Sequence, residues 1–208
     1  MEGLVVVVVL ALVAVLILPA LSKPKGKSNG FSCVNNLKQI DLAMRIWEGD
    51  TGDKYPMAVP VALGGAQEMI ATGNVVACFQ VMSNYLGTPR ILICPGDAVR
   101  RADPNWNLDP SLGWGRLSRA NISYFMGSDA VGSDPQGMVS GDANLVQNGR
   151  LVGSGIVNLA TNITTWSRDR HRGVGVVLFA DGAVKTGTEI SSSTAPGAYA
   201  STNRVVVP

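Results

Sequence analysis

The chain opens with an uninterrupted apolar run and continues with segments in which apolar and polar residues recur at fixed spacing. The run is LVVVVVLALVAVLIL, from Leu4 to Leu18, and it contains no polar side chain. From Gly3 to Leu21 a helix would cover about 28 Å, close to the ~30 Å of a bilayer core. Because a small soluble domain cannot easily bury a helix that is apolar on every side, we expect this helix to lie in a membrane or in an environment that substitutes for one.

A second helical pattern follows between Ser32 and Glu48, where apolar residues step by three and four. This stripe consists of Val34, Leu37, Ile40, Met44 and Trp47, broadened by Leu42, Ala43 and Ile46. Pro24 and Gly26 disfavour the interior of a helix, so we expect a kink or break near Pro24. The stripe predicts that one face of this helix packs on the rest of the domain.

The remaining pattern predicts an α+β domain with an antiparallel sheet. A helix is expected from Asn74 to Leu86, with Asn74 as its cap and Gly87 as its stop. Strands are expected at 90–94, 122–126, 137–140, 156–159 or 163–166, 174–180 and, as an edge strand, 204–207. Asp181-Gly182 lies between two apolar runs, which favours a type I′ hairpin turn. The sequence therefore divides into residues 1–28, a transmembrane helix with a basic linker, and residues 29–208, a single head.

Composition agrees with this division and excludes some functions. The chain of 208 residues contains 24 Gly and 11 Pro but only 15% charged residues, which favours a loop-rich β domain over a helical bundle. A net charge of +2 gives no sign of a nucleic-acid-binding surface. The dense basic cluster of Lys23, Lys25 and Lys27 would favour the cytoplasmic side by the positive-inside rule.

The candidate chemical groups do not predict an enzyme or a metal centre. There is no G-x-S-x-G sequence, the single histidine is His171, and no phosphate-binding loop is present. Ten residues of extended strand would separate His171 from Asp181 by about 30 Å. We therefore expect Asp181-Gly182 to form a turn and His171 to anchor the start of the strand through hydrogen bonds. An anchored hydrolase that uses His171 is the remaining enzymatic alternative.

Cysteines and acidic residues leave two further interpretations open. Cys33, Cys78 and Cys94 are odd in number, and their spacing does not resemble a zinc site. The acidic residues cluster in two places, Glu48, Asp50 and Asp53 in the first and Asp129 and Asp134 in the second. Such loops could hold Ca²⁺, but the spacing of a calcium-binding loop is absent. A solvated helix end with turn residues is the simpler interpretation.

The opening of the chain resembles the N-terminal helix of type IV pilins and type II secretion pseudopilins. Glu2 and Pro19 fall at the family's glutamate-to-proline spacing, and Leu18-Pro19-Ala20-Leu21 matches the end of the family's apolar run. Met1 stands where the family usually has Val or Ile, so we interpret it as an internal GTG codon for Val that was read as a start. The resemblance implies a leader upstream of Glu2 that a prepilin peptidase removes.

Further motifs extend the resemblance over nearly the whole chain. They are SCVNNLKQI at 32–40 with Trp47 and DKYP at 53–56, ICPGD at 93–97, ISYF at 122–125, SGDANL at 140–145, and HRGVGVVLFADGAV, in which His171 precedes Asp181-Gly182 by nine intervening residues. The ordered set is similar to the pilin-like proteins with a C-terminal H-x9-D-G element that are abundant in Verrucomicrobia, Planctomycetes and their relatives.

The resemblance implies a pilin-like fold and a structural role. The chain would be a subunit of a type IV pilus-like or type II secretion pseudopilus filament, assembled through its apolar N-terminal helix with identical or homologous subunits. Glu2 would pair with the amino terminus of a neighbouring subunit. Cys33 and Cys94 lie in family-like motifs and would form a disulfide, with Cys78 as a buried thiol.

The same resemblance implies a location and leaves alternatives. The chain would cross the inner membrane once, with its head in the periplasm, or on the cell surface when assembled. This orientation is opposite to the one that the basic cluster alone favours, since the resemblance places that cluster outside and the charges of the leader inside. Its partners would include the prepilin peptidase and the assembly machinery. One alternative is a minor pseudopilin that does not form long fibres. Another is a membrane-anchored surface or periplasmic binding module, in which the loop that carries Trp106 and Trp114 contacts a polysaccharide or another ligand.

Overall fold

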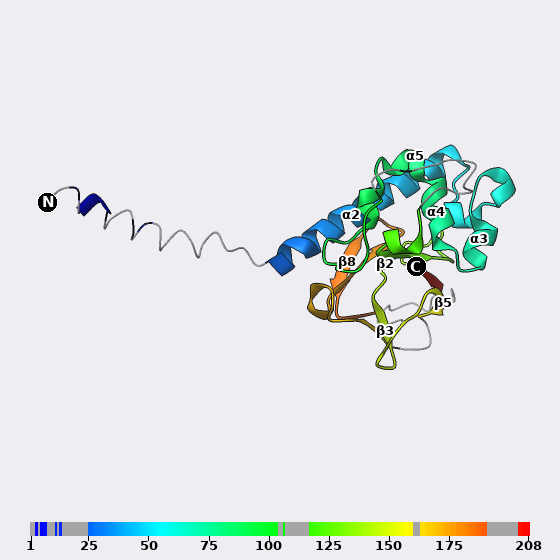
Figure 1. Cartoon of the computed structure of the whole chain (residues 1–208). Helices are drawn as coiled ribbons and strands as arrows, with labels where there is room; N and C mark the ends of the chain where they lie inside the picture. The colour runs from blue at the N-terminus through cyan, green and yellow to red at the C-terminus, as the bar shows by residue number, and fades with distance from the viewer. Residues whose placement is uncertain are drawn as a thin grey trace.

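In the computed structural model, a helix on the N-terminal side leads into an α+β head with antiparallel sheets (Figure 1). The structure describes residues 3, 5–7, 11, 13, 25–103, 106, 117–159, 163–190 and 204–208. The described positions of the apolar run are helical, and the side chains of Val5, Val6 and Val7 are exposed. Within these described ranges, no helix is both long and apolar enough to cross a membrane. Pro24, near which a kink or break was expected, lies outside them.

Helix α2 (Lys25–Asp50) begins outside the head and runs into it. It buries one stripe, composed of Cys33, Leu37, Ile40, Ala43, Met44 and Trp47, so the predicted helical face is confirmed. The prediction was wrong about Leu42 and Ile46, which are exposed because they lie two residues from Ile40 and Met44, about 200° around the helix. The helix also runs through Gly26, at a cost of about 1 kcal/mol relative to alanine. The boundary expected at residues 28/29 therefore falls inside α2.

A layer of short helices covers the C-terminal half of α2. It contains η1 (Pro56–Ala58), η2 (Val61–Leu63), α3 (Gln67–Ala71), α4 (Val75–Val81), α5 (Ser83–Leu86) and η3 (Pro89–Leu92). The predicted helix from Asn74 is divided at Met82, which is wholly buried, so that α4 and α5 both face the core. The prediction of a strand at 90–94 was wrong. Pro89 fixes the start of a 3-10 turn there, and Thr88 Oγ1 accepts the Arg90 N–H.

The main sheet has six antiparallel strands in the order β5-β10-β1-β2-β7-β8. They are β1 (Tyr124–Gly127), β2 (Met138–Asp142), β5 (Gly155–Asn158), β7 (Gly175–Phe179), β8 (Val184–Gly187) and β10 (Arg204–Val207). The expectation of an edge strand at 204–207 was wrong, because β10 pairs with β1 on one side and β5 on the other. Its three valines are fully buried, which an edge position would not provide.

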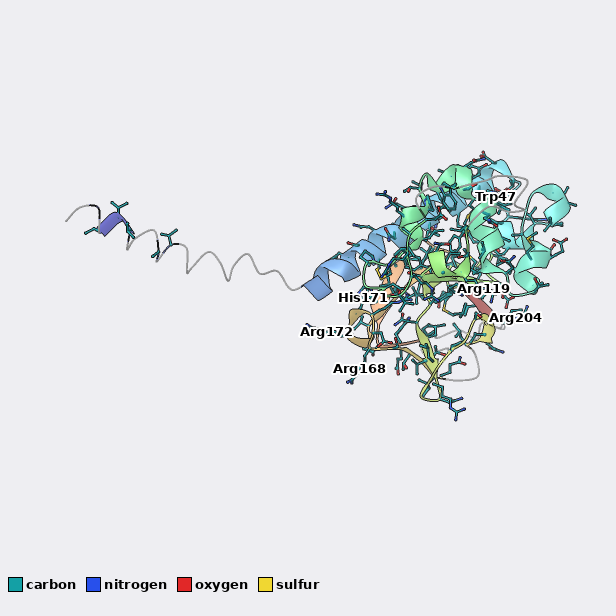
Figure 2. All side chains as sticks on the ribbon, viewed as in Figure 1. Trp47, Arg119, Arg168, His171, Arg172 and Arg204 are labelled. Carbon is teal, nitrogen blue, oxygen red and sulfur yellow. A yellow bond between two sulfur atoms is a disulfide. The ribbon has the colours of Figure 1, made fainter. Side chains whose placement is uncertain are left out.

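Both faces of this sheet are covered, so the head has three layers. Met126, Val176 and Val206 face α2 and the short helices, whereas their neighbours Phe125 and Val177 belong to a second core on the other side. That second core lies against a four-stranded sheet in the order β4-β3-β6-β9. Its strands are β3 (Leu145–Gln147), β4 (Arg150–Leu151), β6 (Thr164–Trp166) and β9 (Glu189–Ile190). Figure 2 shows the side chains that fill these layers, with Trp47 among the helices.

The type I′ hairpin turn lies at another position than expected. At Asp181-Gly182 only Gly182 has a positive φ, 80°, and its N–H donates to Phe179 O at 2.9 Å. This geometry is a type I turn followed by a left-handed glycine, not type I′. The type I′ turn lies instead at Asn148-Gly149, where both φ angles are positive and Gln147 pairs with Arg150. The sequence signal there was missed because the flanking strands are only two or three residues long.

Candidate functional site

The polar centre of the head lies where the N-terminal half of α2 meets the sheet. Here Cys33 of α2 forms a disulfide with Cys94, which follows η3, and their Cα atoms are 5.3 Å apart. This is the pair that the family resemblance implied. Both cysteines are fully buried. The bond ties α2 to the segment that enters the sheet, across 61 positions of sequence.

His171 lies directly against this disulfide. It occupies η6 (His171–Gly173), where His171 and Arg172 both have positive φ angles, 46° and 60°. The imidazole Nε2 is 3.3 Å from Cys33 Sγ and 2.9 Å from Cys94 Sγ. A Cβ at Gly96 would come within 2.8 Å of the ring, so only glycine allows this close packing. His171 therefore holds the start of β7 against α2 through contact with the two sulfur atoms, a contact that the sequence does not indicate.

The other end of the H-x9-D-G motif also contacts α2. Lys38 Nζ donates to Gly182 O, and Arg45 Nη2 donates to Ala180 O at 3.0 Å. His171 and Asp181 thus lie at opposite ends of β7, and in the described structure they do not form a catalytic dyad. We interpret the motif as two attachment points that fix β7 along α2.

Gly182→Ala is expected to lower the free energy of unfolding by about 1–2 kcal/mol, because a left-handed φ is costly for residues with a Cβ. The added Cβ would also approach Arg45 Nη2 to 2.9 Å and Asp41 Oδ2 to 3.0 Å. Gly149→Ala is the matched control, since it has a similar φ of 74° but open space around its Cβ. Urea unfolding of both variants measures the difference. Equal losses of unfolding free energy in the two variants would mean that only the left-handed backbone conformation, and not the contact with α2, makes alanine unfavourable at position 182.

Asp142, at the end of β2, is a wholly buried carboxyl group beside His171. Its Oδ2 accepts the Val176 N–H at 3.1 Å, whereas Oδ1 is buried and has no hydrogen-bond partner. His171 Nδ1 is likewise buried without a partner. Burial raises the pKa of Asp142 to about 7, against the opposing charge of Arg170. Buried polar atoms without partners are rare enough in folded proteins to require an explanation.

An ion pair between Asp97 and Arg170 lies next to this group. Their side chains are only 2% and 6% exposed. Ser123 joins them, since its hydroxyl donates to Asp97 Oδ2 at 2.8 Å and its carbonyl accepts from Arg170 Nη1 at 3.0 Å. Burial alone would raise the pKa of Asp97, but backbone N–H donors at Arg100 and Val99, the Arg170 charge and the Ser123 hydroxyl outweigh it and lower the pKa. The pair fixes η6 to the loop after Cys94.

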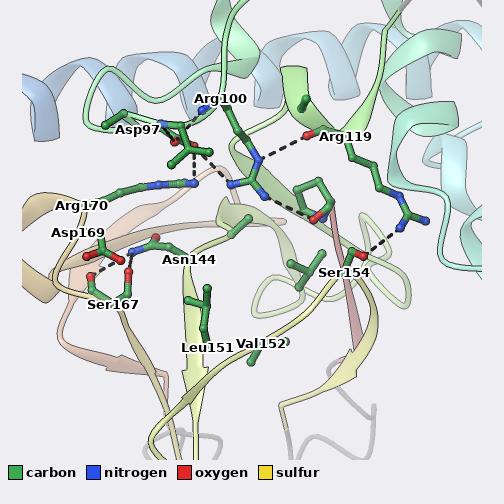
Figure 3. Close-up of a pocket in the computed structure, with 16 residues that line it drawn as sticks. Asp97, Arg100, Arg119, Asn144, Leu151, Val152, Ser154, Ser167, Asp169 and Arg170 are labelled. Carbon is green, nitrogen blue, oxygen red and sulfur yellow. Dashed lines mark hydrogen bonds and ion pairs between the residues drawn. The ribbon is translucent and has the colours of Figure 1, made fainter.

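A cavity of about 470 Å³ opens beside this ion pair (Figure 3). Arg100, Arg119 and Arg170 line it, and each guanidinium group already has partners in the protein. Arg100 donates to Asp97, Arg119 O and Pro208 O, and Arg119 donates to Ser154 Oγ and Gly73 O. The three guanidinium groups therefore join neighbouring loops of the protein, which favours a structural role for the cavity over ligand binding.

Other candidate residues are dispersed. Asp129 forms a bidentate pair with Arg204, and Asp50 accepts from Tyr85. These acidic residues do not gather into a calcium-type group within the part of the chain that the structure describes. Trp106 packs against the main core, whereas Trp114, Glu2 and Pro19 lie outside the described residues.

In comparisons with protein-family models, curated proteins and solved structures, no match to this chain was found.

Labelling of cysteines tests whether Cys33 and Cys94 are bonded to each other and Cys78 is free. It is a free, wholly buried cysteine in α4, and burial raises its pKa to about 12. Because the thiolate is the reactive form, we expect no alkylation of the folded, unreduced chain at pH 8. Guanidinium without reductant should expose one reactive thiol, and added reductant should expose three, as counted by mass spectrometry. Three labels without reductant would contradict the disulfide.

Proposed function

We propose that the protein is a structural subunit of a type IV pilus-like or type II secretion pseudopilus filament, with a pilin-like fold. The observation that carries this proposal is the outer face of α2. Phe31, Leu42 and Ile46 are exposed there, and spacings of eleven and four residues put them on one side of the helix. They lie opposite the stripe that packs in the head. Exposed apolar residues arranged in a stripe are typical of an interaction surface.

The sequence before α2 supports the same proposal. The run from Leu4 to Leu18 is apolar on every side, and its described valines are exposed. Such a segment needs a lipid or protein environment. A filament core would cover both the run and the outer stripe of α2 with neighbouring subunits. A binding module draws less support, because Trp106 packs inward and the cavity arginines are already bonded.

In this proposal Glu2 sets the register of assembly. A carboxylate in an apolar filament core is strongly unfavourable without a cationic partner, which the amino terminus of a neighbour would supply. We expect Glu2→Gln, made in the natural reading frame, to leave membrane insertion intact and to reduce the fraction of protein sheared from cells. Glu2→Asp is the control that keeps the charge. Equal sheared fractions for the native chain and Glu2→Gln would remove the assembly role of this charge.

A change on α2 tests the outer stripe separately. Leu42→Glu places a charge on the exposed face and leaves the buried stripe unchanged, so the head should unfold at the same urea concentration as before. Filaments seen by electron microscopy should be lost. Normal filaments from Leu42→Glu would contradict the proposed packing of α2, and membrane-held protein without fibres from the native chain would favour the minor pseudopilin.

A further inference from the structure

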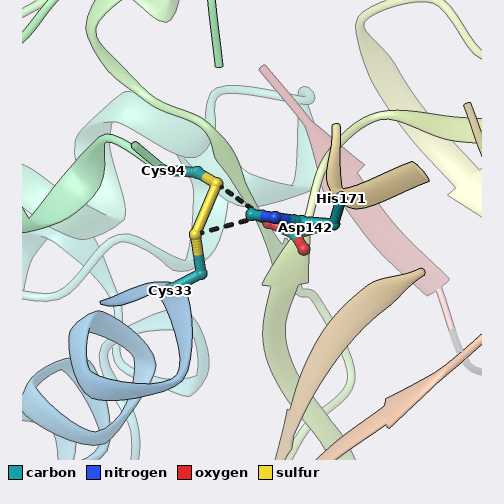
Figure 4. A group of neighbouring side chains, drawn as sticks. All are labelled: Cys33, Cys94, Asp142 and His171. Carbon is teal, nitrogen blue, oxygen red and sulfur yellow. Dashed lines mark hydrogen bonds between the residues drawn. A yellow bond between two sulfur atoms is a disulfide. The ribbon is translucent and has the colours of Figure 1, made fainter. Parts of the chain in front are cut away.

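A compact group of side chains that can bind a metal contains the two cysteines of the disulfide, with His171 and Asp142 together on one side of it (Figure 4). Cys33, Cys94, Asp142 and His171 each offer one ligand atom, and these atoms all lie within 4.8 Å of one another. A tetrahedral Zn²⁺ ion with bonds of ~2.0–2.3 Å holds neighbouring ligand atoms about 3.3–3.8 Å apart. The group therefore has the dimensions that one ion requires once the two sulfur atoms are no longer bonded to each other.

The carboxyl group of Asp142 brings one oxygen into this group. Its side chain is wholly buried; Oδ2 accepts the Val176 N–H, and Oδ1 makes no hydrogen bond. A buried carboxylate oxygen without a donor is costly, and coordination of a metal is one of the few ways to satisfy it. The imidazole is fixed by the close packing of Gly96, so Nε2 stays directed at the two sulfur atoms.

We propose that, when the Cys33–Cys94 disulfide is reduced, these two sulfurs, His171 Nε2 and Asp142 Oδ1 bind one Zn²⁺ ion. The disulfide and the ion are then alternative links at the same place, and each ties α2 to the sheet. No zinc site was expected from the sequence, because the ligands come from four separate elements and have no recognisable spacing. The proposal is independent of filament assembly.

The exchange between the two states has a defined balance. A dithiol donor gives two electrons and two protons to the disulfide, so the protein S–S bond breaks, two thiols form, and the donor becomes a disulfide. Zinc binding then releases the two thiol protons to solvent, since the ligands are thiolates. No electron is transferred to or from the ion.

The surrounding charges and donor types fit zinc better than a harder ion. Two thiolates and a carboxylate carry three negative charges against the two positive charges of the ion, and the adjacent group of Arg170, Arg100 and Asp97 supplies one net positive charge. Calcium and magnesium prefer oxygen ligands, whereas sulfur, imidazole and carboxylate together are typical zinc ligands.

Zinc content of the full-length chain in detergent micelles tests the proposal. The chain is reduced without oxygen by a water-soluble phosphine, which takes up an oxygen atom from water as the disulfide gains two electrons and two protons. After incubation with Zn²⁺ and removal of free metal, we expect one zinc per reduced chain and none in the oxidised chain. X-ray absorption should show two sulfur and two nitrogen or oxygen ligands.

Variants identify the ligands. Asp142→Asn and His171→Gln should weaken zinc binding by at least the ~10–100-fold that outer-shell changes cost, while their oxidised forms keep the disulfide and native circular dichroism. Cys78→Ala should bind zinc like the native chain. The proposal fails if the reduced native protein holds no zinc, stays unfolded with zinc, or shows another set of ligands. It also fails if Asp142→Asn and His171→Gln bind zinc as tightly as the native protein does.

Discussion

Arg170→Met is expected to lower the free energy of unfolding by about 3 kcal/mol at pH 7. The change leaves the Asp97 carboxylate buried without its closest cation, and removal of one partner of a buried pair typically costs ~3–5 kcal/mol. The lower end is expected because Arg100, whose side chain is 21% exposed, still lies 3.4 Å from Asp97 Oδ2. Chemical denaturation followed by circular dichroism measures the loss.

Arg204→Met is the matched control. Arg204 also forms an ion pair with an aspartate, Asp129, but its side chain is 51% exposed. Exposed ion pairs contribute ~0–1 kcal/mol, so this variant should be nearly as stable as the native protein. Equal losses from the two changes would mean that burial of the Asp97–Arg170 pair has no particular energetic role.

The loss in Arg170→Met should depend on pH in a defined direction. The folded-state pKa of Asp97 is lowered, so its charged form stabilises the native protein above the unfolded pKa of ~4, and this contribution is lost as pH falls through the folded pKa. Loss of the Arg170 charge would also raise the pKa of Asp142 further. The difference between native and variant proteins should therefore be largest at neutral pH and shrink in acid. A difference that grows in acid would contradict the role assigned to Asp97.

Local patterns predicted α2, the segment of α4 and α5, and the strands β1, β2, β7 and β10, but not α3, β3, β4 or β9, and not the arrangement of the elements. The stripe on α2 was predictable because burial of one helix face repeats every three to four residues. The pairing of β10 with β1 and β5 was not, since it brings residues 204–207 beside strands at 124–127 and 155–158 through contacts that leave no local signal. The same limit applies to Leu42 and Ile46, whose apolarity looked like core and is exposed.

The polar centre of the head was predicted only in part. Cys33 and Cys94 were paired through a resemblance, and His171 was expected to hold the start of its strand. Asp97 and Asp142 each lie in short motifs that were noted, ICPGD and SGDANL, yet no spacing connects them with His171. They meet only because α2, β2, η6 and the loop after η3 converge. A signal that could have found Asp142 is its position at the end of a wholly buried strand, because a carboxyl group there needs a buried partner.

Replacement of Cys33 and Cys94 by alanine should destabilise the oxidised head by about 4 kcal/mol. A cross-link that closes a loop of 61 residues removes chain entropy of this size from the unfolded state, within the ~2–5 kcal/mol found when native disulfides are lost. The change also leaves His171 Nε2 without the sulfur contacts that hold it.

Cys78→Ala is the control, because it removes a buried sulfur that belongs to no cross-link. Its free energy of unfolding should fall by about 1 kcal/mol, the typical effect of a single substitution. Urea unfolding of the oxidised proteins, with a lower midpoint and a larger denaturant slope for the double variant, measures the effect. Equal stabilities for the double variant and Cys78→Ala would mean that the interactions of α2 with β7 alone hold the helix on the sheet.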